Sequence, residues 1–278
     1  MAKKPKITIV TPSYNQGKYL ERTILSVLSQ DYPNLEYIVI DGASTDNSVD
    51  IIKKYNGKID YWVSEPDKGQ SDAINKGFER SSGDILGWLN SDDYLLENVL
   101  DKIANFKWTN EIGAVVGIGH KVDSNDKIIY TPNVPELTFE ALLDWVHYSH
   151  FMQPACFFSR KAWESVGPLN IDLEYSMDID LWLKIAKQFE FKKIDHPIAH
   201  ALIHDRAKNT AERENVIIET SLLINDYGAQ DIAKKNLTIM TNHLLRYQNA
   251  YHKLKKVPLL NYILKPIARL INKKSKIN

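Results

Sequence analysis

Short apolar runs alternate with longer amphipathic stretches along the first third of the chain. Four runs of five or six residues are predicted to be strands: residues 6–11, 35–40, 59–63 and 85–89. The run at 85–89 has the length of a central strand buried on both faces. Apolar residues recur at helical spacing between them, as at Leu20, Ile24 and Val27, and a further helix is expected to begin near Tyr94. Repeated strand–loop–helix units favour an α/β fold with a mostly parallel central sheet, flanking helices and right-handed crossovers.

The second half of the chain is less regular. Strands are predicted at 112–118, 127–130 and 155–158, and helices at 139–145, 161–166 and 178–189. From about Ala211 the pattern is helical to the end. We therefore expect one α/β domain over residues 1–208, with halves at about 1–110 and 111–208, followed by a helical extension over 209–278.

Composition and charge exclude several classes of protein. Lys and Arg number 35 and so do Asp and Glu, so the net charge is zero and no nucleic acid partner is expected. Cys156 is the single cysteine, which fits a reducing compartment. The N-terminal residues show no signal peptide, and no run approaches the ~18 apolar residues of a membrane span. A cytoplasmic location is expected.

The C-terminal end departs from this balance. Residues 253–278 contain eight Lys or Arg and no acid, and Leu260, Ile263, Leu264, Ile267 and Ile271 form an apolar stripe at helical spacing. A basic amphipathic helix of this kind is typical of segments that dock on an anionic membrane, here the inner face of the cell membrane. Packing of the stripe on the rest of the chain, or on a second subunit in a homo-oligomer, stays open.

Polarity changes abruptly where the strand at 85–89 ends, in Asn90-Ser91-Asp92-Asp93. In open α/β sheets ligands bind outside the carboxyl ends of strands, and two adjacent acids repel unless a cation or donors hold them. A hard divalent ion, completed by a phosphate-bearing ligand, suits such a group. Alternatively, Ser91 to Asp93 cap the helix expected near Tyr94.

Four segments carry a resemblance to a known family. They are Val10-Thr11-Pro12-Ser13-Tyr14-Asn15, Ile40-Asp41-Gly42-Ala43-Ser44-Thr45-Asp46, the run from Gly69 to Gly77, and Asn90-Ser91-Asp92-Asp93. Together they resemble the inverting family 2 glycosyltransferases over about residues 6–205. The resemblance implies a GT-A fold, a nucleotide-sugar donor, Mn²⁺ or Mg²⁺, and a glycan or lipid-linked acceptor.

The resemblance assigns the donor side residue by residue. It places Thr11, Pro12 and Tyr14 in the wall around the nucleotide base, and Asp41 as the acceptor of a base N–H, which favours a UDP-sugar. Donor-binding positions that lie nearer the sugar and the diphosphate are Asp67, Gln70, Asp72, Asn90 and Ser91. Plain roles are the alternatives: a turn or cap acid for Asp41, and solvated helix-start residues for Asp67, Gln70 and Asp72.

The resemblance also names the metal ligands and a catalytic base. Asp92 matches the metal-binding acid of the Asp-X-Asp motif, and His204 the late histidine near the metal or diphosphate. Asp178 matches the base that takes a proton from the acceptor hydroxyl. Asp178 and Asp180 cannot both face one site from a helix, so we expect Asp180 to cap or to be solvated. Arg206 and Lys208 are weaker candidates for contact with the diphosphate.

Three positions depart from the family pattern. Gly42 stands where relatives usually carry a second acid, Asn90 replaces the first acid of Asp-X-Asp, and Met177 replaces a glutamate before the base. Asn90 can still ligate through its carbonyl but brings no charge.

The expected function is transfer of a sugar with inversion, in polysaccharide or glycoconjugate synthesis. A non-catalytic nucleotide-sugar-binding subunit or scaffold is the alternative. A dinucleotide-dependent oxidoreductase is rejected, because Gly117-Ile118-Gly119 does not continue as G-x-G-x-x-G. A nucleotidyltransferase is rejected because the loop at 11–17 has no Gly-rich, Arg-containing cluster.

Overall fold

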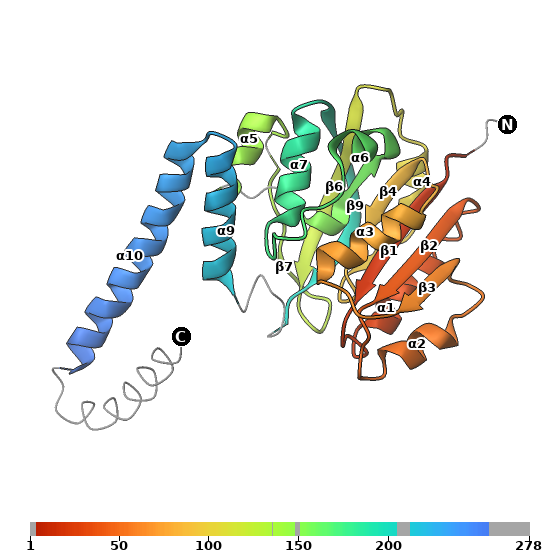
Figure 1. Cartoon of the computed structure of the whole chain (residues 1–278), viewed down its shortest axis with the longest axis horizontal. Coiled ribbons are helices and arrows are strands. Elements are labelled where there is room, and N and C mark those ends of the chain that lie inside the picture. Colours follow the sequence, from red (N-terminus) through yellow and green to blue (C-terminus); the bar gives the residue numbers. More distant parts are fainter. Residues whose placement is uncertain (1–3, 135, 148–150, 205–211, 256–278) are drawn as a thin grey trace.

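The computed structural model describes residues 4–134, 136–147, 151–204 and 212–255. Four parallel strands form the N-terminal half of its sheet: β1 (Ile7–Ser13), β2 (Leu35–Asp41), β3 (Tyr61–Ser64) and β4 (Ile85–Trp88). Their order is β3-β2-β1-β4, with Ile9 opposite both Tyr37 and Gly87. The crossover helices are α1 (Leu20–Leu28), α2 (Ser48–Lys54) and α3 (Gln70–Arg80). This half has the predicted arrangement, and its strands all end at one edge (Figure 1).

The second half makes the sheet mixed. β8 (Cys156–Ser159) lies antiparallel between β4 and β6 (Ile112–Val122), and β9 (Glu190–Leu202) runs parallel to β6. The described order is β3-β2-β1-β4-β8-β6-β9-β5, with β7 (Ile128–Tyr130) paired to β6. The remaining elements are α4 (Val99–Ala104), α5 (Phe139–Leu143), η1 (Gln153–Ala155), α6 (Arg160–Val166), α7 (Met177–Ala186), α9 (Arg213–Asp226) and α10 (Gln230–Lys255).

The prediction of a helix that begins near Tyr94 is wrong. Residues Tyr94–Leu95 form the short strand β5, paired with His200 and Ala199 of β9, because a distant strand offers these two residues backbone partners. The helix α4 begins at Val99, after Asn98 has turned the chain in the left-handed region at φ 59°. Ser91 to Asp93 therefore do not cap a helix.

Two further expectations need correction. The continuous helical pattern after Ala211 breaks at Gly228, whose φ of 87° is accessible to glycine at little cost, and the chain turns there from α9 into α10. The thirteen-residue strand β9 was not predicted, because its first half alternates buried Phe191 with exposed charged residues and carries no continuous apolar run.

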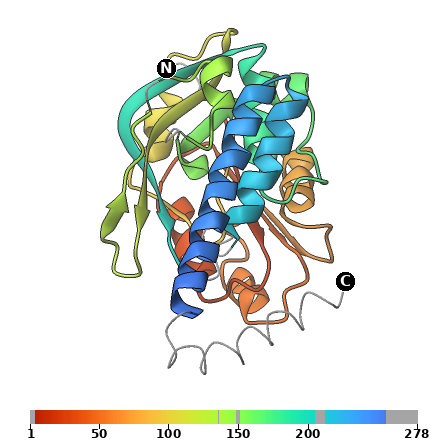
Figure 2. The same cartoon turned by 90° about the vertical axis from the view of Figure 1, so that its left-hand side faces the viewer.

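Apolar residues on the two faces of the sheet form two core layers. One layer joins the sheet to α1, α2 and α4 through Leu20, Ile24, Ile52 and Ile103. The other joins it to α3, α6 and α7, and also includes Leu223 and Ile224 of α9 and Ala233 of α10. Figure 2 shows the α9–α10 hairpin lying along one side of the molecule. The start of the extension is thus part of the domain's core.

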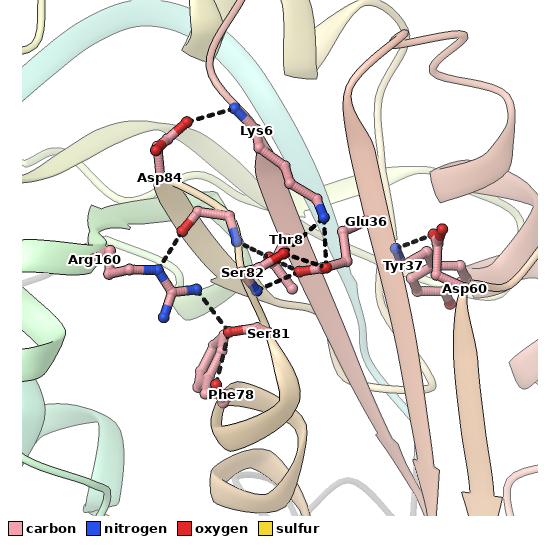
Figure 3. Close-up of polar contacts among 11 residues, drawn as sticks. Lys6, Thr8, Glu36, Tyr37, Asp60, Phe78, Ser81, Ser82, Asp84 and Arg160 are labelled. Carbon is pink, nitrogen blue, oxygen red and sulfur yellow. Dashed lines mark hydrogen bonds and ion pairs between the residues drawn. The ribbon is translucent and has the colours of Figure 1, made fainter.

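A polar clamp holds the opposite edge of the sheet, where the strands begin (Figure 3). Glu36 accepts hydrogen bonds from Lys6 at 2.7 Å, from the Thr8 hydroxyl at 2.6 Å and from the backbone and hydroxyl of Ser82 at 2.7 Å. Burial alone would raise the pKa of Glu36, but these donors outweigh it and hold the pKa at about 2. Arg160 adds a bond to the Gly83 carbonyl at 2.6 Å. The clamp fixes β1, β2 and β4 relative to one another.

Candidate functional site

The loops after β1 and β2 are locked together where the strands end. Asn15 donates its backbone N–H to the Ser44 hydroxyl at 2.8 Å, and its side-chain carbonyl accepts the Thr45 N–H at 2.8 Å. The Asp46 carboxylate accepts the Gly17 N–H at 2.9 Å. Two strand-end loops joined in this way form a rigid rim, which suits recognition of a ligand without reordering.

The three residues predicted to wall a nucleotide base differ in accessibility. Tyr14 is 62% exposed, so its ring is available for stacking. Thr11 is fully buried, with its hydroxyl 3.1 Å from the Tyr37 hydroxyl, and Pro12 is buried within β1. Thr11 therefore supports the site from within the core.

The carboxylate of Asp41 is completely buried at the end of β2. It accepts the Ser44 N–H at 2.9 Å, the Ser44 hydroxyl at 2.5 Å and the Ser64 hydroxyl at 2.7 Å. A carboxylate has about four acceptor positions, so one is left for a further donor such as a base N–H. Asp41 fixes the loop after β2 in the absence of ligand.

The space around Gly42 is limited by a neighbouring side chain. A Cβ atom there would lie 2.6 Å from the Asp67 Oδ2, so Asp67 takes the space that a side chain at 42 would need. Asp67 also accepts the Gly69 N–H at 2.9 Å, which holds the loop before α3. A side chain at position 42 would therefore require Asp67 to move.

Asn90 joins the two halves of the site. Its side-chain carbonyl accepts Gln70 Nε2 at 2.7 Å, and its amide nitrogen donates to Asp93 Oδ2 at 3.2 Å and to Gln153 Oε1 at 3.3 Å. Gln153 in turn donates to the Trp88 carbonyl at 2.9 Å. Because two acceptors face the amide nitrogen, an aspartate at position 90 would meet repulsion there. The carbonyl that the sequence offered as a metal ligand is already used by Gln70.

Asp92 and His204 meet at the end of β4. His204 Nε2 lies 2.9 Å from Asp92 Oδ2, although the residues are 112 positions apart in the chain. The His204 ring also stacks on Tyr19, with centroids 4.6 Å apart. The two predicted metal ligands are therefore brought together from opposite ends of the domain.

The acids next to Asp92 and in α3 have structural partners. Asp93 is 6% exposed, and it accepts hydrogen bonds from the Asn90 amide and, at 3.3 Å, from the Leu202 N–H. Burial raises the pKa of Asp93 well above the ordinary value, and the negative charge of Asp92 raises this pKa further. Asp72 accepts the Lys68 N–H at 3.0 Å, and Ser91 is buried.

Asp178 lies in the first turn of α7. Its carboxylate accepts the Ile179 N–H at 2.8 Å, and its charge contributes to the raised pKa of the buried Cys156 thiol on β8. Burial raises the pKa of Asp178 to about 6, and the negative charge of Glu219 contributes in the same direction. A carboxylate with this pKa is ionised at neutral pH and is a stronger base than an ordinary aspartate.

Asp180 neither caps the helix nor is solvated, contrary to expectation. It is 4% exposed, pairs with Lys184 at 2.6 Å and accepts the Tyr227 hydroxyl at 2.7 Å. Asp180 therefore ties α7 to the turn between α9 and α10. The two acids do face different ways, as helical spacing requires.

Aromatic stacking connects β4 with α7. The Trp88 ring at the end of β4 stacks on Trp182 of α7, with centroids 5.4 Å apart and ring planes at 10°. Trp182 lies one turn after Asp178. Asp178 is in this way held beside the strand that leads to Asn90 and Asp92.

Comparison with known families decides the identity of this arrangement. The model of glycosyl transferase family 2 matches residues 8–167, more than half of the chain. The chain belongs to this family. The match includes the strand ends that carry Asp41, Gln70 and Asp92, and it stops before Asp178 and His204.

Curated relatives of this family 2 glycosyltransferase include polysaccharide synthases. It is 27% identical over 204 residues to the chondroitin synthase of Pasteurella multocida strain Pm70 and to the hyaluronan synthase of Pasteurella multocida, covering 72% of the chain and 21% of each synthase. An uncharacterized glycosyltransferase of Haemophilus influenzae is 38% identical over 111 residues, 39% of the chain and 44% of that protein. The chain thus spans from about a fifth to under half of these relatives.

Solved structures share the fold. The crystal structure of S. aureus TarS 1–349 has a TM-score of 0.60 at 20% identity and covers 79% of the chain and 64% of TarS. The mannosyltransferase PcManGT from Pyrobaculum calidifontis, in complex with GDP-Man and Mn²⁺, has a TM-score of 0.59 at 18% identity. This match covers 99% of the chain and 87% of the PcManGT chain. This glycosyltransferase therefore has the GT-A fold.

The residues present fit a divalent cation that also binds a phosphate ligand. Asp92 supplies a carboxylate oxygen and His204 an imidazole nitrogen, both of which ligate Mn²⁺, whereas Mg²⁺ prefers oxygen alone. Within the described residues no group of three His, Cys, Asp or Glu gathers. A cation at Asp92 and His204 would take its other ligands from the donor and from water.

Two residues of this glycosyltransferase site were not singled out from sequence. Gln153 precedes the start of the strand predicted at 155–158, and no pattern in the sequence marks its contact with Asn90. Glu219 carried no signal, because it is one acid on an exposed-looking helix of the extension. The candidates Arg206 and Lys208, and residues 256–278 of the tail, lie outside the described residues.

Proposed function

We propose that this chain transfers a sugar from a nucleoside-diphosphate sugar, with a UDP-sugar favoured, to a hydroxyl of a glycan or lipid-linked acceptor. Inversion at the anomeric carbon, and a role in cell-surface polysaccharide or glycoconjugate synthesis, are part of the proposal. The observation that carries it is the Asp92–His204 contact at 2.9 Å, formed at the sheet edge to which Trp88 and Trp182 also anchor Asp178.

The donor would lie along the carboxyl ends of β1 to β4. Tyr14 would stack on the base, and Asp41 has one acceptor position left for a base N–H. Asp67, Gln70 and Asp72 line the loop proposed to lie beneath the sugar and ribose. Mn²⁺ or Mg²⁺ held by Asp92 and His204 would neutralise charge that develops on the departing diphosphate.

Asp178 is proposed as the general base. Its carboxylate takes the proton of the acceptor hydroxyl, and the hydroxyl oxygen attacks the anomeric carbon from the face opposite the nucleotide. As the new C–O bond forms, the bond to the diphosphate oxygen breaks, and the configuration inverts. This single displacement needs only one base, which agrees with the separate, structural use of Asp180.

A donor screen tests this proposal. Melting temperature is measured with UDP, UDP-GlcNAc and GDP-Man, with Mn²⁺ or with EDTA, since structural neighbours were solved with these ligands. Nucleoside diphosphate release is then followed for each donor that stabilises the protein. Mn²⁺-dependent binding with release supports a transferase. If the donors bind but no nucleoside diphosphate is released from any of them, even with glycan acceptors present, the result would favour a non-catalytic nucleotide-sugar-binding subunit instead.

We propose that the C-terminal segment docks on an anionic membrane surface and that the protein is peripheral there. In the described part of α10, Leu244, Tyr247 and Leu254 are 52%, 73% and 44% exposed, so this part of the helix is not packed on the domain. Within the described residues, none of the helices has the length and apolarity that crossing a bilayer requires. The basic segment 253–278 follows directly, and each well-placed Lys or Arg contributes ~1 kcal/mol at an anionic surface.

Removal of residues 253–278 tests the docking. The full chain is expected to co-sediment with vesicles containing anionic lipid and to be released by salt, because the attraction is screened. The shortened chain should stay in the supernatant while keeping its donor-induced melting shift. Vesicles of neutral lipid serve as the control. Equal sedimentation of both chains on anionic vesicles would exclude docking by this segment.

A further inference from the structure

Glu219 of α9 makes an unusual set of contacts with the chain that leads into α7. Its Oε2 accepts the Glu174 N–H at 3.0 Å, and its Oε1 accepts the N–H groups of Tyr175 and Ser176, each at 2.7 Å. The Ser176 hydroxyl adds a fourth bond at 2.8 Å. One carboxylate therefore satisfies three consecutive backbone donors.

These contacts hold the chain segment that leads into the helix, and they engage the side chain that would otherwise cap it. Ser176 is the N-cap residue of α7, yet its side chain makes no capping bond to the helix, because the hydroxyl points to Glu219. The negative charge of Glu219 also lies at the end of α7 where the helix dipole is positive. A residue of the extension thus fixes both the start and the direction of α7.

Asp178 projects from this same turn, two residues after Ser176. The titratable groups that interact with it electrostatically are Cys156 from β8 and Glu219 from α9, whereas Asp180 on α7 itself is paired with Lys184 and faces another way. Among the described residues, Glu219 is the charged group whose field acts on Asp178. Glu219 therefore affects Asp178 in two ways, through the backbone that carries it and through charge.

We propose that Glu219 is a positioning residue for the acceptor side, holding the first turn of α7 so that Asp178 meets the acceptor hydroxyl. The proposal rests on the proposed role of Asp178 as base. It makes α9 a working part of the catalytic unit, although α9 lies beyond the region that matches the family model. The negative charge of Glu219 also has a role in this proposal, because a nearby negative charge makes the Asp178 carboxylate a stronger base.

Replacing Glu219 by glutamine tests the proposal. Glutamine keeps the size but loses the charge and half of the acceptor capacity. We expect turnover to fall about tenfold with donor affinity unchanged, as for loss of a group that orients a base. The acid limb of the turnover–pH profile should also move to lower pH, because removal of a like charge lowers the pKa of Asp178. A purely structural role would lower melting temperature without moving the limb.

Two further variants sharpen the result. Glu219→Asp keeps the charge with a shorter reach, so turnover should fall while the acid limb stays in place; it also serves if the glutamine variant does not fold. Glu214→Gln, at an exposed acid of the same helix, should behave as wild type.

The outcomes separate this proposal from the proposed function. If Asp178→Asn is inactive while Glu219→Gln keeps wild-type turnover and pH profile, Glu219 does not position the base, and the function stands. If Asp178→Asn is fully active, the base assignment fails, and the role of Glu219 fails with it.

Discussion

Asp178→Asn is expected to lower turnover by about 10²–10⁴-fold, the range typical for loss of a general base. Asparagine keeps the shape of the side chain and can still accept the Ile179 N–H, so donor affinity should hardly change. In the wild type, turnover should fall as pH drops below about 6, where Asp178 becomes protonated. Turnover at saturating donor, measured between pH 5 and 8, checks both expectations.

The same variant should melt at a higher temperature at neutral pH. The folded pKa of Asp178 is about 6, above the ordinary value of 3.8, so folding favours the protonated acid. This contribution is fully present below about pH 4 and is lost as pH rises through 6. At pH 7 to 8 the ionised group costs on the order of 1–3 kcal/mol, which asparagine removes. The gain should vanish near pH 4.

Asp180→Asn is the matched control, with the opposite signs. It weakens the contacts of Asp180 with Lys184 and Tyr227, so stability should fall by about 1–2 kcal/mol while turnover stays near wild type. An active Asp178→Asn enzyme would remove Asp178 from the mechanism. An inactive but folded Asp180→Asn enzyme beside it would assign the base to Asp180.

Asp92→Ala is expected to abolish turnover, with a loss of at least about 10²–10³-fold, and to remove the Mn²⁺-dependent part of donor binding. The described contact of the Asp92 side chain is with His204, and the residue lies at a strand end, so the fold should survive. Donor titration with Mn²⁺ and with EDTA separates the two parts of binding. In the variant the two titrations should coincide.

Asp84→Ala provides the control at the other end of β4. Asp84 accepts the Lys6 N–H at 2.8 Å in the clamp of Figure 3, far along the strand from Asp92. This variant should keep the response to Mn²⁺, even with lower stability. Near-normal, EDTA-sensitive turnover in Asp92→Ala would show that Asp92 is not a ligand.

The N-terminal half of the fold follows from sequence because three of its strands, β1, β2 and β4, are largely buried, while β3 is a half-buried edge strand. Runs such as Val39 and Ile40 in β2 are continuous and apolar, and the polar residues begin where the strands end. The strands β5 and β9 cannot be predicted from such apolar runs. Tyr94–Leu95 is a strand only because His200 and Ala199 lie beside it, and half of β9 is exposed. Pairing between distant segments decides these elements, and local pattern does not report it.

The same distinction applies to the site. Asp92 and His204 could be named from motif positions, and they lie 2.9 Å apart, whereas their role as metal ligands stays a prediction. Other contacts depend on side-chain directions that no motif encodes. Examples are the hydrogen bond from Asn90 to Gln153 and the contacts of Glu219 with the chain before α7. The role of Asp180 was misjudged because its partner Tyr227 lies in a turn that the sequence pattern hid within one long helix.

The anomeric configuration of the product tests the central proposal, a single displacement with Asp178 as base, most directly. The enzyme is incubated with Mn²⁺ and the α-linked nucleotide sugar that the screen selects, and the new glycosidic bond is assigned by proton NMR. A β-linked product, formed by wild type and absent with Asp178→Asn, is the predicted result. An α-linked product from the same donor would contradict the single displacement.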